Sequence, residues 1–366
     1  MAAKMYVNLK NIEHNVGKIK EKLPKDTTII AMVKADAYGL GDVQISKFLN
    51  TIGIDFLGVA IAQEAVHLRK NNINSYILVT GQFLEEDIES IIQYDLAVSV
   101  SNLNLLKLLN SEASKQNKKI KTHIKIDTGM TRLGFNPNEI LETVKDITNN
   151  MTNIIIDGIY THLSSADTDD DYTIKQLNLF NNTVNLLKLN NYTFRYIHAL
   201  NSCGVLKFSK YSYNTVRVGD ILYGYYPDES LRKYITLKPS VKLVAPIINI
   251  REIEKDCSIS YSQTFKSTDK MKIATIQMGY ADGLDRKLSN KLNVYINNIP
   301  CKIVGNICMD MCMIDVTNVP NVNVGDYCNI IDYDESIYTI ADIIGTINYE
   351  VISRISKRVK RIYIEK

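Results

Sequence analysis

The sequence predicts an α/β fold in two parts, an N-terminal TIM (β/α)8 barrel followed by a C-terminal, mostly antiparallel β-domain. The chain has 366 residues, which is more than one hydrophobic core usually holds. Up to about residue 224, short apolar runs rich in β-branched residues alternate with amphipathic stretches. After Lys238–Pro239, strand-like runs follow one another with little helix between them. We therefore expect a barrel domain over residues 1–230 and a β-domain over residues 231–366.

The first part contains eight strand candidates, the number that closes a TIM barrel. Amphipathic helical patterns lie between them, and strands that alternate with helices are expected to be parallel. An open doubly wound sheet is the alternative, but no glycine-rich dinucleotide fingerprint follows any early strand. The expected strands are Thr28–Ala35, Phe56–Ala60, Tyr76–Thr80, Leu96–Val100, Thr122–Asp127, Ile155–Leu163, Tyr196–Asn201 and Thr215–Tyr223.

The second part is expected to form a sheet that ends with a helix and a final strand. The helix should cover about Thr339–Ser356, with Thr339 as its N-cap, and Arg361–Glu365 should be the closing strand. The other expected strands are Val241–Ile250, Ile273–Met278, Leu292–Ile296, Ile303–Val304, Met311–Val316 and Tyr327–Ile331.

The composition argues against several classes of function. A net charge of +3, with Lys and Arg spread along the chain, gives no basis for binding nucleic acid or an acidic membrane surface. The six cysteines form no CxxC pair, which favours reduced thiols over a metal site or disulfides. The N-terminus is too polar for a signal peptide, and no apolar run is long enough for a membrane span. We expect a cytoplasmic protein that holds no metal.

Polar residues gather where the predicted barrel strands end, which is where TIM barrels carry their active sites. The set contains no paired carboxylates, no Ser–His–Asp triad and no metal-ligand spacing. It contains lysines, other basic and hydroxyl side chains, and small residues after the last two strands. These residues are Lys34, Lys125, Arg132, His162, Asn201, Ser202, Arg217, Gly219 and Asp220.

Lys34 is the strongest candidate for chemistry. It follows the apolar run Ile29–Val33, and a buried lysine needs a functional reason. The loops after strands seven and eight are the usual phosphate seat of this fold. A lysine facing a phosphate seat suggests a covalent link between the amine and a phosphorylated aldehyde. On position alone, a strand-end lysine that extends its charge to solvent is an equally good interpretation.

At these residues the sequence resembles the alanine racemase family, the fold-type III enzymes that use pyridoxal 5′-phosphate (PLP). The likeness covers essentially the whole chain, and the motifs follow one another in the family's order. The run Ala31–Gly39 resembles the PLP-lysine signature of the family. The other matching motifs are Lys125 with Asp127–Phe135, Tyr160–His162, Asn201–Ser202, Met278–Gly283, Cys308–Asp310 and Gly345–Glu350.

The resemblance implies a racemase that interconverts L- and D-alanine, supplying D-alanine for peptidoglycan. Lys34 would hold PLP and act as one base. Tyr261 would be the base on the opposite face, reaching the site from the partner subunit of a homodimer. Two bases on opposite sides suit a reaction that moves a proton between the two faces of one carbon. His162 would hydrogen-bond Tyr261 and tune it, because a phenol with a pKa of about 10 is a poor base.

The resemblance also implies how cofactor and substrate are held. Arg217 would face the pyridine nitrogen, which would stay unprotonated because arginine keeps its own proton. Arg132 would contact the cofactor's phenolic oxygen and the substrate carboxylate, which the Met309 backbone amide would share. Lys125 matches a lysine that is carbamylated in many family members. The remaining cofactor contacts would come from Tyr38, Asn201, Ser202, the backbone at Gly219 and Asp220, and Tyr349.

Four residues depart from the pattern of the family. Leu40 replaces a common histidine, Ser262 a glycine and Asn306 an arginine, and Asp220 places an acid where an apolar residue is common. An acid in a phosphate-binding turn is unfavourable unless only its backbone N–H faces the phosphate.

Three other activities are open to such a sequence. A racemase of serine or a longer amino acid is disfavoured by the bulk of Tyr349. A fold-type III decarboxylase would not need a second base such as Tyr261. A non-catalytic PLP carrier is typically a lone barrel.

Overall fold

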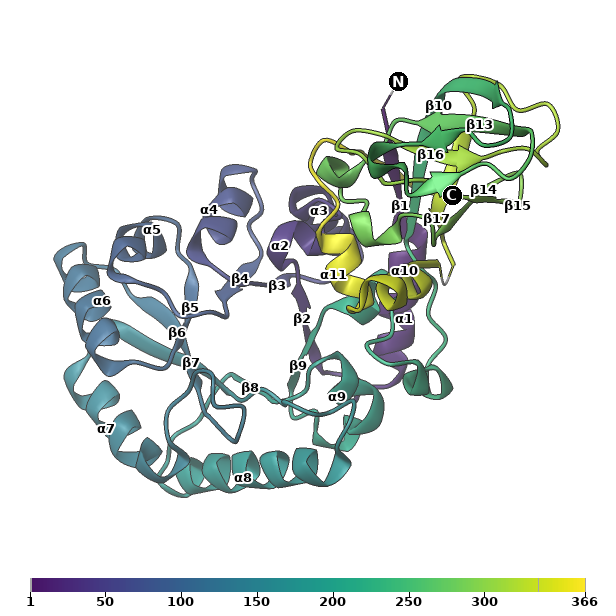
Figure 1. Ribbon diagram of the computed structural model, residues 1–366. Coiled ribbons are helices and arrows are strands. Elements are labelled where there is room, and N and C mark those ends of the chain that lie inside the picture. The colour runs from purple at the N-terminus through teal and green to yellow at the C-terminus, as the bar shows by residue number, and fades with distance from the viewer. Residues whose placement is uncertain (1, 335, 366) are drawn as a thin grey trace. The chain divides into compact units, whose positions relative to one another are not determined.

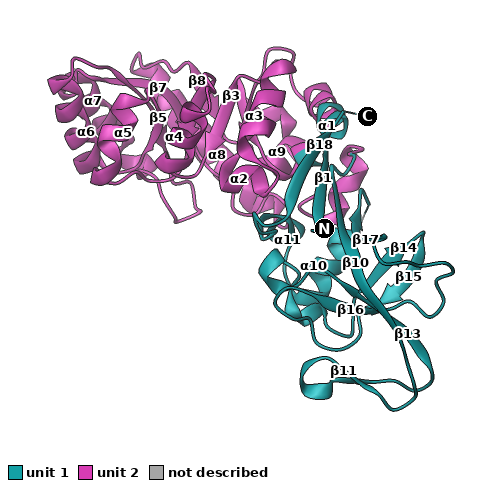
Figure 2. Ribbon diagram, turned by 90° about the horizontal axis from the view of Figure 1, so that it is seen from above, with its two compact units in different colours: residues 1–14, 223–225, 238–366 teal, residues 15–222, 226–237 magenta. Residues whose placement is uncertain are grey.

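The computed structural model describes residues 2–334 and 336–365, and the chain forms two compact units (Figures 1 and 2). The unit that we call the barrel unit contains Asn15–Leu222 and Tyr226–Leu237. The unit that we call the β-unit contains Met1–His14, Tyr223–Tyr225 and Lys238–Lys366.

Eight parallel strands of the barrel unit close into a barrel, which confirms the predicted fold. Each strand pairs with its successor in the chain, and the last strand pairs with the first, with Ile30 opposite Arg217. This closure excludes the open sheet that was the alternative. The strands are β2 (Thr28–Met32), β3 (Phe56–Val59), β4 (Tyr76–Val79), β5 (Ala97–Val100), β6 (Ile120–Lys125), β7 (Ile154–Tyr160), β8 (Tyr196–His198) and β9 (Thr215–Val218).

Helices alternate with the strands along the chain, and the longer ones bury an apolar stripe. In α8 the predicted series Leu177, Phe180, Val184 and Leu187 is completely buried, as a single apolar stripe requires. Asp169 caps this helix by accepting the N–H of Tyr172. The helices are α1 (Leu9–Glu21), α2 (Lys34–Tyr38), α3 (Asp42–Thr51), α4 (Ala62–Lys70), α5 (Ile88–Gln93), α6 (Leu103–Lys115), α7 (Ile140–Asn150), α8 (Asp170–Leu189) and α9 (Ser202–Lys207).

Several barrel strands end earlier than the sequence predicts. β2 stops at Met32 instead of Ala35, β8 at His198 instead of Asn201, and β9 at Val218 instead of Tyr223. Apolar residues continue past each end, so the sequence pattern alone does not mark the boundary. The last residues of each run instead form tight turns, and these turns carry the candidate site residues.

The β-unit is built on a branched, mostly antiparallel sheet, as predicted. Strand β10 lies at its centre and pairs with three neighbours, while β1 and β18 form a parallel pair. The first strand and the small pair β11–β12 were not predicted. The strands are β1 (Lys4–Asn8), β10 (Val241–Ile253), β11 (Ser258–Ile259), β12 (Phe265–Lys266), β13 (Met271–Ile276), β14 (Asn293–Ile296), β15 (Ile299–Lys302), β16 (Cys312–Asp315), β17 (Tyr327–Asp332) and β18 (Lys360–Ile364).

Two predictions for the β-unit are wrong. Ile303–Val304 is not a strand: Ile303 makes only an isolated bridge to Ile314, and the strand is the preceding segment β15. The turn at Asn297 and Asn298, both with positive φ, sets the pairing of β14 with β15 and places that strand before Ile303.

The expected single helix over Thr339–Ser356 is instead two helices, α10 (Ser336–Ile344) and α11 (Asn348–Ser353). Gly345 adopts φ +76° and its N–H bonds to the carbonyl of Ala341, which ends α10. Thr339 therefore lies inside α10 and is no N-cap. Among the residues that the structure describes, no helix is both long and apolar enough to cross a membrane.

Candidate active site

Lys34 is the first residue of an unusual turn that leaves the C-terminal end of β2. The four residues Ala35–Tyr38 all have φ between 51° and 58°, so they form one left-handed helical turn. Such a conformation costs roughly 1–2 kcal/mol for each residue with a Cβ. Glu64 stabilises the turn, since its carboxylate accepts the N–H of Ala35 and the N–H of Ala60, each at 2.7 Å. Strain of this kind is typical of functional sites.

The Lys34 amine lies in a positive, partly dry environment. Burial and the nearby charges of Arg132 and Arg217 lower its pKa, although Glu64 and Asp220 act in the opposite direction. A lower pKa leaves more of the amine neutral, which is the form that attacks a carbonyl or accepts a proton. Lys34, Arg132, Arg217 and Asp220 belong to the C-terminal ends of β2, β6 and β9 or to the turns that follow, and these ends meet at one end of the barrel.

Arg217 is a buried cation at the end of β9. Its guanidinium donates to Nδ1 of His198 at 2.7 Å, to Nδ1 of His162 at 3.1 Å and to the carbonyl of Thr161 at 2.8 Å. Burial lowers its pKa to about 10, so it stays charged at neutral pH. Among the described residues no carboxylate forms an ion pair with it. A buried charge held only by neutral acceptors is unusual and marks the position as functional.

A chain of hydrogen bonds continues from Arg217 through the barrel. Nε2 of His198 lies 2.9 Å from Nδ1 of His123, whose Nε2 lies 3.1 Å from the Tyr76 hydroxyl, which donates to Asp157 at 2.8 Å. Arginine has only donors, so each histidine accepts at Nδ1 and donates at Nε2. The charge of Arg217 is thus connected to a carboxylate through three polar side chains that all point their donors the same way.

Acid sensitivity is predicted by three histidines of the barrel unit, of which His123 and His198 are fully buried. Burial and the charge of Arg217 lower the pKa of His123 to about 3 and those of His162 and His198 well below their usual value. In the unfolded chain each imidazole binds a proton near pH 6.5, so the unfolded state gains protons first as pH falls. Each histidine should therefore reduce the free energy of unfolding by about 1.4 kcal/mol per pH unit below about pH 6.5.

Replacing His123 with glutamine should reduce this pH slope by about 1.4 kcal/mol per pH unit between about pH 6 and pH 4. Urea unfolding of the cofactor-free protein at several pH values measures the slope. An equal slope for H123Q and wild type would contradict the prediction.

Lys125 and Tyr160 lie beside Arg217 inside the barrel. The Lys125 amine sits 5.6 Å from the centre of the Tyr160 ring, and the Arg217 guanidinium lies 5.0 Å from the same ring. Burial, together with Arg132 and Arg217, lowers the pKa of Lys125 to about 8. An amine with this pKa is partly neutral at pH 7, as reaction with carbon dioxide would require.

The turns after β8 and β9 meet through hydrogen bonds to small residues. The Ser202 hydroxyl accepts the N–H of Gly219 at 3.1 Å, and Asn201 caps α9 by accepting the N–H of Gly204 at 2.9 Å. A Cβ on Gly219 would collide with the Tyr38 hydroxyl, so only glycine allows this close approach. The structure thus brings together, with Asp220, the residues that the sequence analysis assigns to a phosphate seat.

Arg132 is exposed and stands on a loop after β6. The Asp127 carboxylate shapes this loop by accepting the N–H groups of Gly129 at 2.9 Å and Thr131 at 3.0 Å. The Phe135 N–H returns to the Lys125 carbonyl at 2.8 Å. The loop therefore holds the Arg132 charge near Lys34 and Lys125, whose pKa values it lowers.

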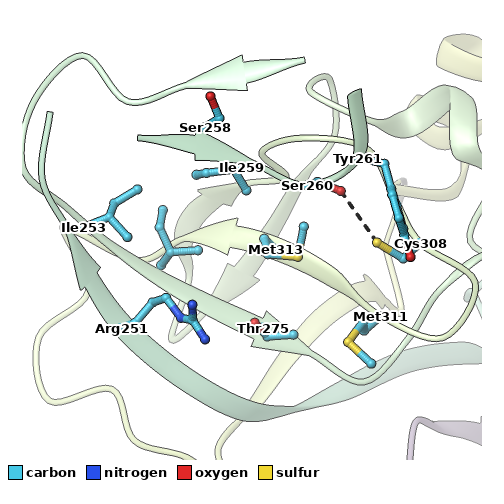
Figure 3. A pocket seen from close by; sticks show the side chains of 11 residues that line it. Arg251, Ile253, Ser258, Ile259, Ser260, Tyr261, Thr275, Cys308, Met311 and Met313 are labelled. Atoms are coloured by element: carbon cyan, nitrogen blue, oxygen red, sulfur yellow. Dashed lines mark hydrogen bonds between the residues drawn. The ribbon is translucent and has the colours of Figure 1, made fainter. Parts of the chain in front are cut away.

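Tyr261 belongs to the β-unit, where its side chain is 71% exposed. It stands at the rim of a pocket of about 560 Å³ lined mainly by β10, β13, β16 and the β11–β12 hairpin (Figure 3). The preceding Ser260 has φ 67° and ψ −177°, a conformation nearly restricted to glycine. Asn306 holds this turn, because its amide donates to the Tyr261 carbonyl at 2.8 Å and its carbonyl accepts the Ser260 hydroxyl at 2.5 Å.

The other predicted residues of the β-unit lie on two further segments. Met309 is 53% exposed, so it does not fill the core, and its carbonyl accepts the N–H of Ala281 at 2.9 Å. Asp310 accepts from Arg358 at 2.8 Å, which ties this turn to the C-terminal part of the chain. Tyr349 is half-buried in the short helix α11.

The sequence analysis missed the polar interior of the barrel, namely Tyr76, His123, Asp157, Tyr160 and His198. One signal was available. His123 stands two residues before Lys125 in β6, and alternate residues of a strand point to the same face. A histidine on the face that carries a site lysine could therefore have been assigned to the barrel interior. Glu64, which stabilises the lysine turn, carried no comparable signal.

Comparisons with known proteins agree across both units. Residues 7–227 match the family model for the N-terminal domain of alanine racemase, and residues 240–363 match the model for its C-terminal domain. The chain belongs to the alanine racemase family. It is 39% identical over 365 residues to an alanine racemase of Methanococcus maripaludis, covering 98% of this chain and 97% of the relative. It is also 39% identical to alanine racemase 1 of Clostridium acetobutylicum, covering 98% and 94%.

The solved structure of the alanine racemase of Clostridium difficile 630 is similar over the whole chain. Its TM-score is 0.96 at 35% identity, and the match covers 100% of this chain and 96% of that one. Alanine racemases are PLP-dependent isomerases. The two-part fold expected from the resemblance is therefore the fold of this family.

Proposed function

We propose that this protein is an alanine racemase that interconverts L- and D-alanine with PLP held at Lys34. The observation that carries the proposal is a lysine of lowered pKa just after β2, at the same end of the barrel as a buried arginine that forms no ion pair with any described carboxylate. Full-length similarity to alanine racemases supports alanine as the substrate. The expected cytoplasmic location stays a prediction.

The residues of the barrel unit fit PLP. Gly219, Ser202, Asn201 and Tyr38 would hold the phosphate, since glycine at position 219 lets the Tyr38 hydroxyl lie close to a backbone N–H that also bonds the Ser202 hydroxyl. Arg217 would face the pyridine nitrogen, and the family resemblance assigns Tyr349 to the phosphate as well. When bound, PLP supplies an electron sink that stabilises negative charge on the carbon that loses its proton.

Two residues of this chain would replace the α-proton of the substrate with a proton on the opposite face. The Lys34 amine and the Tyr261 hydroxyl would stand on opposite faces of the α-carbon. One of them takes the α-proton, leaving the electron pair on that carbon, and the other gives a proton to the opposite face. Arg132 and the Met309 backbone amide would hold the substrate carboxylate. His162 accepts from Arg217 at Nδ1, so its Nε2–H is available to bond the Tyr261 oxygen.

A two-fold dimer would complete the site. We infer that Tyr261 acts on the partner's Lys34, because a highly exposed tyrosine, in the same pocket lining as the exposed Met311, suits a surface that a second subunit covers. Lys125 would carry a carbamate that orients Arg132, as its lowered pKa allows.

Incubation of the purified, PLP-loaded protein with each L-amino acid in deuterated water tests the function. Alanine should lose its optical rotation while gaining deuterium at the α-carbon, and other amino acids should react far more slowly. Faster reaction of serine, or release of carbon dioxide, would overturn the proposal in favour of the other activities considered above.

Asn306 is expected to position Tyr261. Replacing Asn306 with alanine removes the hydrogen bond that its side-chain amide donates to the Tyr261 carbonyl. The loss of roughly 1 kcal/mol should lower kcat by about 5- to 10-fold. KM for alanine should change little, because Asn306 is not expected to contact the substrate. Asn306→Asp keeps the size but loses the donor, so it should behave like the alanine variant.

Initial rates in both directions measure these constants, and the exposed Asn293 on β14 supplies a control substitution to alanine. A wild-type kcat for both Asn306 variants would contradict the positioning role.

A further inference from the structure

Asp220 places a carboxylate in the predicted phosphate seat. It is the first residue of the 3-10 turn Asp220–Tyr223 that follows β9. Its carboxylate accepts the N–H of Ile221 at 3.1 Å, and the Ser202 hydroxyl also bonds to it. These are donors of the kind that a phosphate group would use. The side chain therefore bonds to donors that a phosphate group at this turn would also use.

Few groups near Asp220 can offset a second anion. The Lys34 ammonium, from the turn after β2, interacts favourably with the carboxylate. Cys203, from α9, stays neutral because burial and the Asp220 charge raise the pKa of its thiol. Tyr38 and Ser202 contribute hydroxyl groups. A phosphate group bound in this seat would add negative charge beside the carboxylate. Two anions would then share one partly dry pocket, which is strongly unfavourable.

We propose that Asp220 couples phosphate binding to the uptake of one proton: its ionised carboxylate fills the seat in the free protein, and the phosphate replaces it as the carboxylate becomes a neutral acid. This inference rests on the proposed function, since it assumes a phosphorylated cofactor at this site. The balance is simple. One solvent proton forms an O–H bond with the carboxylate, and no electrons are transferred. The neutral acid can then donate to a phosphate oxygen instead of repelling it.

Protonation of the Asp220 carboxylate costs little free energy near neutral pH. Burial already raises the pKa of Asp220 to about 6, so a proton is acquired with little cost near neutral pH. Above about pH 6 each further pH unit should weaken cofactor binding about tenfold, because one more proton must be taken from solution for each ligand bound. Asparagine has the same shape without the charge, so Asp220→Asn should remove this dependence.

Cofactor affinity as a function of pH tests the proposal. The cofactor-free wild-type protein and D220N are titrated with PLP between pH 6 and pH 9, and dissociation constants are measured by equilibrium dialysis. D220N should bind more tightly than wild type by about tenfold at pH 7 and about 100-fold at pH 8. The ratio of the two dissociation constants at each pH is free of the pH dependence of the Lys34 reaction and of phosphate ionisation, because both proteins share these.

Two measurements separate this inference from the proposed function. Calorimetry at pH 8 in two buffers of different ionisation enthalpy should show one more proton taken up by the wild-type protein than by D220N. Pyridoxal, which lacks the phosphate, should bind both proteins equally. The coupling would be overturned if the dissociation constants of the two proteins for PLP changed equally with pH. It would also be overturned if the two proteins differed as much in their affinity for pyridoxal. Failure of both proteins to bind PLP would instead overturn the proposed function. Asp220→Ser, which also lacks the charge, replaces D220N if that variant does not fold.

Discussion

Replacing Lys34 with alanine is expected to reduce alanine racemisation by at least about 10⁴-fold, since it removes both the covalent anchor of the cofactor and one of the two bases. The visible absorbance band of the lysine-bound cofactor should also disappear. The substitution should cost little stability, because the left-handed turn after Lys34 is held by its backbone and by Glu64 rather than by the amine.

Racemisation rates and absorbance spectra of the purified variant measure both effects. Lys47, an exposed lysine on α3, provides the control, and K47A should keep wild-type activity and absorbance. A K34A protein that retains the band or more than about a hundredth of the activity would show that another amine carries the cofactor.

Replacing Tyr261 with phenylalanine should have the second largest effect, a loss of about 10²- to 10⁴-fold in racemisation. Only the hydroxyl is removed, and it stands on an exposed side chain, so folding should not change. Lys34 would still exchange the α-proton on its own face. One enantiomer of alanine should therefore continue to exchange its α-proton with deuterated water, while the other should not.

Proton exchange of each enantiomer, followed by nuclear magnetic resonance, measures this asymmetry. Tyr295→Phe, at a partly exposed position on β14, is the matched control for loss of a phenol and should leave exchange of both enantiomers unchanged. Equal exchange of both enantiomers by Y261F would exclude Tyr261 as a base.

The same two variants test whether Tyr261 acts across subunits. In a mixed dimer of K34A and Y261F, one site would combine the intact Lys34 of one chain with the intact Tyr261 of the other. Random mixing should then restore about a quarter of the wild-type activity, since half of the dimers would be mixed and each would have one complete site. Absence of any recovery after unfolding and refolding the two chains together would show that both bases come from one chain.

The wild-type chain carried through the same refolding is the reference. The activity that it recovers is the wild-type value of which the mixed sample should regain about a quarter.

Local sequence patterns predicted most of the elements. Strands such as Tyr76–Val79 and helices such as α8 follow from apolar periodicity, because which side chains a segment buries depends on residues near one another in the chain. The same patterns placed Lys34 and Arg217 at strand ends. Periodicity failed where a boundary depends on a single turn, as at Gly345, or on pairing, as at Ile303.

The candidate site divides in the same way. Its motif residues were found from the sequence, since a TIM barrel brings the C-terminal ends of its strands together at one end. The polar interior from His198 to Asp157 was not, because these hydrogen bonds join strands that lie far apart in the chain.

The amino-acid sequence by itself thus determined the order of the elements, the barrel and the identity of the residues at its end. Only the tertiary structure decided that Arg217 is held by neutral imidazoles, that Lys34 opens a left-handed turn, and that the Asp220 carboxylate bonds within its own turn. The reason is physical. Hydrophobic periodicity is a property of one segment, whereas the charge state and orientation of a buried polar group depend on every segment that surrounds it.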